Sequence, residues 1–138
     1  MNHTIHRRRL LAGMAAALLA GPALAQAPYP SRPITLVVPF APGGGNDILA
    51  RAIAPLLAER LGQPVVVDNK PGAGGNIGTD FVARAQPDGH TLLIASNQVT
   101  INPAIGVKTP FTLEKDFAPV SQIASVPIVL VAHPAQPY

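Results

Sequence analysis

Short apolar runs and longer helical patterns alternate along the chain. The run Ile34–Val38 (ITLVV) is rich in β-branched residues and is typical of a strand buried in a parallel sheet. From Asp47 to Leu61, apolar residues recur every three to four positions, which predicts a helix. Its N-cap is Asn46 or Gly45, and its C-cap is Gly62.

The same order of elements follows a second time. Val65–Val67 is a second strand-like run, Asn76–Ala85 a second helical pattern and Thr91–Ala95 a third strand-like run. This alternation predicts an α/β fold, and right-handed crossovers would bring the carboxyl ends of the parallel strands to one edge. Open α/β sheets bind ligands at that edge. Pro55, inside the first helical pattern, should weaken or kink the helix.

The pattern becomes less regular after Ser96. One helical turn is predicted near Leu113–Asp116, and two further strands are predicted at Phe117–Ala124 and Pro127–Ala132. The proline-rich end that follows suggests a linker into a further part of a longer protein.

A glycine-rich loop follows each of the first two strands and opens a helix. The loops read APGGGND and PGAGGNIG. Neither contains the lysine and hydroxyl residue of a Walker phosphate loop, and Ile77 interrupts a dinucleotide fingerprint. The glycines either permit tight turns at positive φ or expose backbone N–H groups to an anion. Two such loops at one sheet edge favour an anion site, and a carboxylate suits such a site as well as a phosphate does.

Four polar residues near these loops have two interpretations each. Asp47 either complements the helix dipole or accepts a hydrogen bond from a ligand. Asn76 is either a helix cap or a ligand contact, and Asn97 and Gln98 either reach the crevice or are ordinary loop residues.

The chain shows no catalytic apparatus. It has no cysteine, and Ser96 lacks the elbow sequence of a serine nucleophile. His90 and His133 are far apart in sequence, which disfavours a metal pair; a turn or solvent-facing position is expected for each. No base is paired with a nucleophile, so neither an enzyme nor a metal or other cofactor is predicted.

The first 25 residues read as an export signal. Arg7–Arg9 precede the apolar stretch Leu10–Ala20, and the small-residue site Ala23–Ala25 predicts cleavage before Gln26. The arginines fit either a Sec or a twin-arginine signal. The net charge of +3 lies wholly in this leader, since seven basic and seven acidic residues remain after it. Nucleic acid is therefore not an expected partner, and the mature protein should be exported.

Several segments closely resemble the Bug family, the extracytoplasmic receptors of tripartite tricarboxylate transporters. The resemblance runs from Tyr29 to about Pro134 and rests on YPSRPITLVVPFAPGGGNDILAR, LGQPVVVDNKPGAGGNIGTDFVARAQPDGHTLL and DFAPVSQIASVPIVLVAHP. It implies a type II periplasmic-binding-protein fold, in which residues 26–138 form the N-terminal part of lobe one and end in the first hinge strand. It also implies a periplasmic receptor that takes a small carboxylate and meets the membrane subunits of a transporter.

The resemblance further implies which residues hold the ligand carboxylate, largely through backbone groups. They are Pro39, Phe40, Ala41, Gly43, Gly44, Gly45, Asn46, Asp47, Gly72, Ala73, Gly74, Gly75 and Asn76, while Ser96, Asn97 and Gln98 would line the cleft. Where this family usually has a tyrosine, the chain has His90, which bears on specificity.

Three other functions remain open on the sequence. The closed receptor could signal to a membrane sensor instead of a transporter. An exported enzyme on a similar sheet would turn a carboxylate over. A truncated remnant would have no activity, because half of the binding cleft would be missing.

Overall fold

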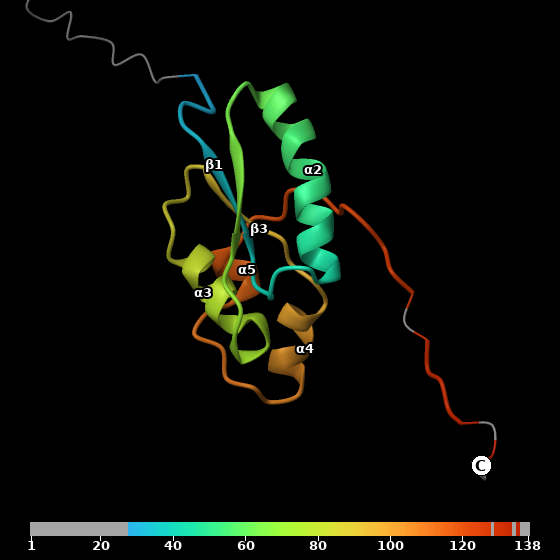
Figure 1. Cartoon of the computed structure of the whole chain (residues 1–138). Coiled ribbons are helices and arrows are strands. Elements are labelled where there is room, and N and C mark those ends of the chain that lie inside the picture. Colours follow the sequence, from blue (N-terminus) through green and yellow to red (C-terminus); the bar gives the residue numbers. More distant parts are fainter. Residues whose placement is uncertain (1–27, 128, 134, 136–138) are drawn as a thin grey trace, which may run out of the picture.

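The computed structural model describes residues 28–127, 129–133 and 135 (Figure 1). The predicted leader, residues 1–25, lies outside them. The elements in chain order are β1 (Ile34–Val38), α2 (Gly45–Leu61), β2 (Val65–Asn69), a 3₁₀ turn η1 (Ala73–Gly75), α3 (Asn76–Ala83), β3 (Thr91–Leu93), α4 (Gln98–Ala104) and α5 (Leu113–Asp116). No helix within the described ranges combines the length and the hydrophobicity of a membrane span.

The three strands form one parallel sheet in the order β2-β1-β3. Residue 34 pairs with residue 65 and residue 38 with residue 69, so β1 and β2 are matched along their whole length. The chain adds β2 on one side of β1 and β3 on the other. Crossovers of one hand then place α2 and α3 on opposite faces of the sheet, as Figure 1 shows. The carboxyl ends of all three strands lie at its lower end.

The central strand β1 is buried on both faces. Leu36 and Val38 pack with Ala50 of α2 and with Ile94, and all four are at most 3% exposed. Val37, which points to the other face, is 0% exposed. A continuous apolar run, rather than an alternating one, is what a strand covered on both faces requires.

The predicted α/β order is confirmed, with shifted ends. β1 and α5 have the predicted bounds, whereas β2 extends to Asn69, β3 stops at Leu93 and α3 stops at Ala83. The N-cap of α2 is Gly44, and its C-cap is Gly62 in the left-handed conformation, as predicted. Helix α4 was not predicted.

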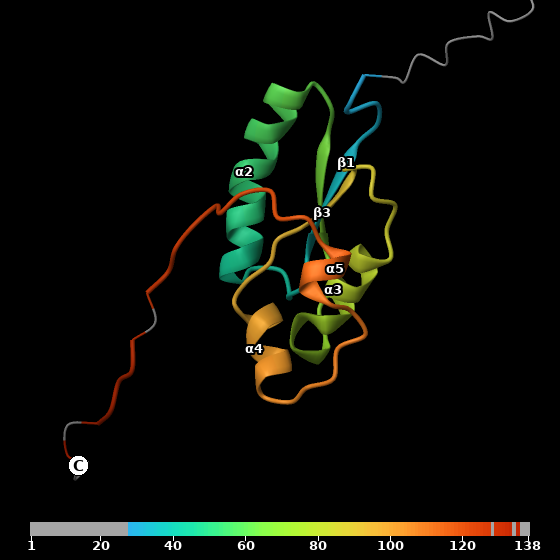
Figure 2. The same cartoon turned by 180° about the vertical axis from the view of Figure 1, so that it is seen from behind.

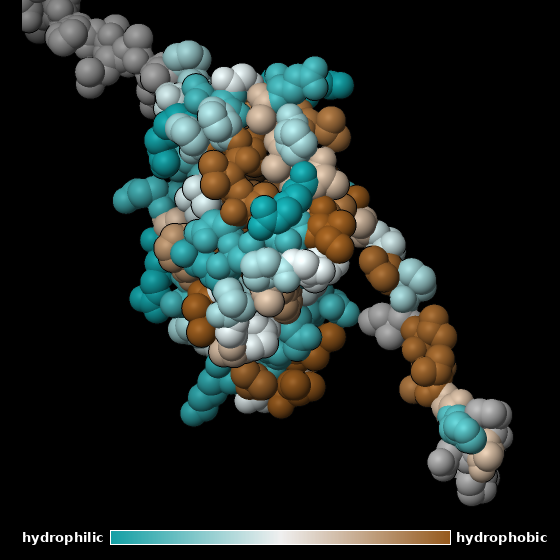
Figure 3. Space-filling model, viewed as in Figure 1, coloured by the Kyte–Doolittle hydropathy of each residue, from teal (hydrophilic) through white to brown (hydrophobic). Residues whose placement is uncertain are grey.

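The two strands predicted near the end of the chain are wrong. Residues 117–127 and 129–132 form no strand, and the segment crosses α2 and then runs away from the body in both views (Figures 1 and 2). A β-rich sequence becomes a strand only when a neighbour accepts its backbone hydrogen bonds, and none of the described strands does so. Its apolar side chains are exposed, as the brown surface in Figure 3 shows.

Replacing Pro55 by alanine should stabilise the protein. Pro55 lies within α2, where it has no N–H to donate to the carbonyl oxygen of Arg51. Restoring that bond at an exposed position should raise the free energy of unfolding by about 1–2 kcal/mol, after allowing for the greater freedom of the unfolded alanine chain. Urea unfolding checks this result, with Glu59→Ala on the same helix as a control expected to change little. No gain from Pro55→Ala would contradict the prediction.

Candidate functional site

Three loops meet at the carboxyl edge of the sheet. Loop 1 (Pro39–Gly44) follows β1, loop 2 (Lys70–Gly75) follows β2, and residues 94–97 follow β3. Each loop leads into a helix, so the N-terminal ends of α2, α3 and α4 gather at the lower end of Figure 1. The N-caps of α2 and α3 are glycines, Gly44 and Gly75, and the side chain of Asn97 does not cap α4. The free N–H groups in the first turns of α2 and α3 therefore have no capping side chain as an acceptor.

Loops 1 and 2 lie directly against each other, as the topology predicted. A Cβ placed on Gly75 would lie 3.4 Å from Cζ of Phe40 and 3.7 Å from Cβ of Pro39. Gly78, in the first turn of α3, also faces Pro39. The two glycine loops thus form one continuous surface.

The glycines of loop 2 are explained by the fold. Gly72, Gly74 and Gly75 have φ values of 127°, 62° and 92°, which favour glycine. Ala73 between them has a φ of 47° and is the one described non-glycine residue with a positive φ. The tight-turn interpretation therefore accounts for this loop without a ligand.

Loop 1 and the start of α2 differ from loop 2, because the fold does not explain all of their glycines. Gly43 has a φ of 84°, but Gly44 has a φ of −76°, which any residue adopts. A Cβ on Gly44 would make an ordinary contact of 3.6 Å with the Ala41 oxygen, and a Cβ on Gly45 would meet nothing within 4 Å. Both residues are exposed. Neither backbone conformation nor packing requires glycine at positions 44 and 45.

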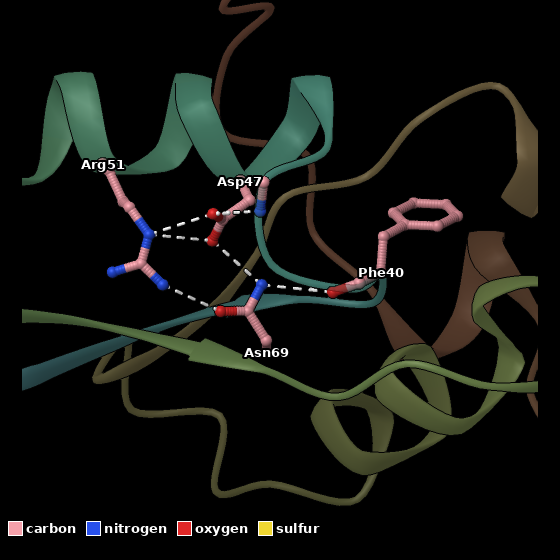
Figure 4. A network of polar contacts seen from close by, with 5 residues as sticks. Phe40, Asp47, Arg51 and Asn69 are labelled. Carbon is pink, nitrogen blue, oxygen red and sulfur yellow. Dashed lines mark hydrogen bonds and ion pairs between the residues drawn. The ribbon is translucent and has the colours of Figure 1, made fainter.

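The carboxylate of Asp47 is the centre of a closed polar network (Figure 4). It accepts hydrogen bonds from the Gly43 N–H at 2.8 Å, from Arg51 Nε at 3.0 Å and from Asn69 Nδ2 at 2.9 Å. The Arg51 guanidinium also donates to Asn69 Oδ1 at 3.0 Å. The side chain of Asp47 is 3% exposed. Asp47 thus joins loop 1, α2 and the end of β2, and its role as a ligand contact stays a prediction.

The network keeps Asp47 ionised. The hydrogen bond from Arg51, followed by those from Gly43 and Asn69, lowers the pKa of Asp47 from 3.8 to about 2. The carboxylate is therefore charged throughout the neutral and mildly acidic range.

A second network ties α4 to loop 2. Asn102, 4% exposed, donates from Nδ2 to the Gly74 oxygen at 3.1 Å and to Asn76 Oδ1 at 2.9 Å. Its Oδ1 accepts a hydrogen bond from Gln98 Nε2 at 2.6 Å. Of the polar residues predicted after β3, Gln98 thus joins the glycine loops, whereas Asn97 is exposed at the N-cap of α4 without capping it. The hydroxyl oxygen of Ser96 accepts the Gln98 N–H at 3.4 Å.

Three residues of these networks, Asn69, Arg51 and Asn102, were not predicted from the sequence. Asn69 ends β2 directly before loop 2, so a polar residue at the carboxyl end of a strand was a usable signal. Arg51 stands four residues after Asp47 on one helix, which was also a usable signal. Nothing local links Asn102 to the glycine loop, because Gly74 and Asn76 lie 28 and 26 residues away in the chain.

His90 lies apart from these networks. It is 6% exposed, which corrects the expectation of a solvent-facing residue, although it does follow the predicted turn. Its Nε2 accepts a hydrogen bond from the Ser31 N–H at 3.3 Å. Its Nδ1 lies 3.3 Å from Asp88 Oδ1 without forming a hydrogen bond. The backbone N–H of His90 and the guanidinium of Arg32 lower the pKa of Asp88 to about 2. Together these residues fasten the segment before β1 to the turn before β3.

Glycine loops and helix N-termini at the carboxyl edge of a doubly wound parallel sheet are typical of α/β proteins that bind ligands at that edge. The sequence profile of the tripartite tricarboxylate transporter family receptor, TctC, matches residues 49–138. The chain therefore belongs to this receptor family, as its resemblance to the Bug proteins predicted.

Individual relatives agree with this assignment. Protein BugT of Bordetella pertussis is 46% identical over 125 residues, which cover 88% of this chain and 37% of BugT. A TctC solute-binding protein from Polaromonas is 42% identical with a TM-score of 0.58, over 62% of this chain and 30% of that one. A periplasmic transporter structure is 49% identical with a TM-score of 0.56, over 59% and 29%. The predicted fold class is confirmed, and the chain spans well under half of the length of these relatives.

Proposed function

We propose that this chain forms the carboxylate-binding surface of an extracytoplasmic solute receptor, which captures a small carboxylate for the membrane subunits of a tripartite tricarboxylate-type transporter. The family assignment supports a receptor that binds its solute without changing it. Export by the predicted leader, with cleavage after Ala25, would bring the protein to the periplasm.

The observation that carries this proposal is the pair Gly44 and Gly45. The fold does not need glycine at either position, yet both residues are exposed and stand at the N-terminus of α2, which has no side-chain cap. A side chain there would project into the space in front of these groups. Backbone N–H groups at a helix N-terminus bind a carboxylate both by hydrogen bonding and through the positive end of the helix dipole.

We expect other predicted residues to border the same space. The ligand carboxylate would be held by the exposed part of loop 1 and by Gly72–Gly74 of loop 2, which lie against each other. Gln98 would contribute the third side, because Asn102 ties it to loop 2. No charged side chain is needed to hold the anion.

Gly45→Ala should weaken carboxylate binding without destabilising the fold. Succinate or citrate, titrated into the ¹⁵N-labelled chain, should shift the amide signals of loop 1 and loop 2 in the wild type. The added methyl group should weaken this response by about tenfold or more, which corresponds to about 1.4 kcal/mol. Sodium chloride at equal ionic strength is the control for non-specific anion effects.

Two results would contradict the proposal. If neither acid shifts the loop signals more than chloride does, the surface is not a carboxylate site. If the spectrum of the acid itself changes during incubation, the chain turns its ligand over and is an enzyme.

A further inference from the structure

Asn69 makes hydrogen bonds to three residues, one in loop 1 and two in α2. Its Nδ2 donates to the Phe40 oxygen at 3.1 Å and to Asp47 Oδ1 at 2.9 Å. Its Oδ1 accepts a hydrogen bond from Arg51 Nη2 at 3.0 Å. One amide at the end of β2 thus holds the start of loop 1 and the first turns of α2, as Figure 4 shows.

The surroundings fix the orientation of this amide. Both hydrogens of Nδ2 have acceptors, and Oδ1 faces the positively charged guanidinium of Arg51. A reversed amide would place its oxygen against the Phe40 carbonyl and the Asp47 carboxylate, which are both acceptors. Asn69 can therefore satisfy its neighbours in one orientation only.

This orientation fixes the direction of a backbone N–H group in loop 1. In a trans peptide bond, the C=O of one residue and the N–H of the next point in opposite directions. Because the Phe40 C=O points toward Asn69, the Ala41 N–H points away from it, on the exposed part of the loop. Asp47, also held by Asn69, fixes the Gly43 N–H.

We propose that Asn69 is a positioning residue for ligand binding: it holds loop 1 so that the Ala41 N–H faces the bound carboxylate. This inference rests on the proposed function. Asn69 does not touch the ligand; it acts through the Phe40–Ala41 peptide and through Asp47.

The structure supplies a matched control in Asn102. Its Nδ2 donates to the Gly74 oxygen, so it holds loop 2 as Asn69 holds loop 1. Both residues are asparagines whose amides bridge a loop carbonyl and a second side chain. Leucine at either position removes the amide at similar volume, so each variant should disturb its own loop.

The experiment titrates succinate into ¹⁵N-labelled wild type, Asn69→Leu and Asn102→Leu, and follows each loop separately. In Asn69→Leu, the succinate-induced shifts of Ala41, Gly43 and Gly44 should be lost while those of Ala73 and Gly74 persist. Asn102→Leu should show the reverse. A purely structural role would weaken the responses of both loops alike.

Each outcome decides between the hypotheses. Intact loop 1 shifts in Asn69→Leu, or an equal loss in both loops, would overturn the role of Asn69 while leaving carboxylate binding in place. Absence of shifts in the wild type would instead remove the proposed function, and this inference with it. If Asn69→Leu does not fold, Asn69→Ser removes the amide without burying an apolar side chain, and the same criteria apply to it.

Discussion

Alanine in place of Gly78 should lower the free energy of unfolding by about 3 kcal/mol. The added Cβ would lie 2.8 Å from the Lys70 oxygen, from Cα of Pro39 and from Cβ of Pro39. Two of these atoms belong to backbone, and the Lys70 N–H is itself bonded to the Val38 oxygen at 2.9 Å. Because neither segment can move aside cheaply, α3 would have to shift away from loop 1. Urea unfolding followed by circular dichroism measures this loss.

Gly45→Ala is the control for this substitution. It introduces the same methyl group near the start of a helix, but there the new Cβ meets nothing within 4 Å. Its stability should be unchanged or slightly higher, since alanine favours helices more than glycine does. Equal losses at positions 45 and 78 would show that steric contact with Pro39 and Lys70 is not the cause. Gly78→Ala should be both less stable and weaker in ligand binding. Gly45→Ala should be weaker in ligand binding but no less stable.

A second large loss of stability is expected from Asp47→Ala. The substitution removes the acceptor shared by the Gly43 N–H, Arg51 and Asn69, and it releases loop 1 from α2. The fall in the urea midpoint should be several times that of Asp80→Ala. Asp80 makes the same i,i+4 pair with Arg84 on α3, but Arg84 is 70% exposed, and exposed pairs of this kind contribute little. Similar midpoints for the two variants would contradict the structural role of Asp47.

The difference between wild type and Asp47→Ala should also depend on pH. The folded-state pKa of Asp47 is about 2, below its ordinary value of 3.8, so ionised Asp47 stabilises the folded state. This contribution is fully present above about pH 4 and is lost as the pH falls toward 2. The two urea midpoints should therefore stay a constant distance apart from pH 7 to pH 5 and converge in stronger acid. A constant separation down to pH 2 would show that Asp47 acts by packing alone.

The sequence was sufficient to predict the order of elements from β1 to β3 and the contact between the two glycine loops. The apolar runs of β1 and β2 and the helical spacing of α2 are local patterns, and the handedness of crossovers then fixes which strand ends are neighbours. The choice between structural and functional glycines was not readable from the sequence. Gly44 and Gly75 look alike in their loops, and only their φ values of −76° and 92° distinguish them.

The hydrogen bonds between polar groups far apart in the sequence were the main feature that could not be predicted. Asn69 meets Phe40 across 29 residues and Asn102 meets Gly74 across 28, so no window of local sequence contains both partners. Helix α4 was missed because Pro103 lies inside it and argues against a helix. The strands predicted after residue 117 failed for the opposite reason: their composition is strongly β-like, but strand formation depends on a partner that composition does not reveal.

That unpaired segment also affects how the protein behaves at high concentration. Val126, Val129, Leu130 and Val131 are between 72% and 97% exposed, and no charged residue occurs from Phe117 to Ala132. Uncharged, β-branched stretches of six or seven residues are the kind that stack between molecules into cross-β aggregates. Pro119 and Pro127 interrupt the segment, because a proline cannot donate to an intermolecular ladder. The two prolines restrict the aggregation-prone stretch to the few residues after Pro127. Self-association in concentrated solution should begin at those residues.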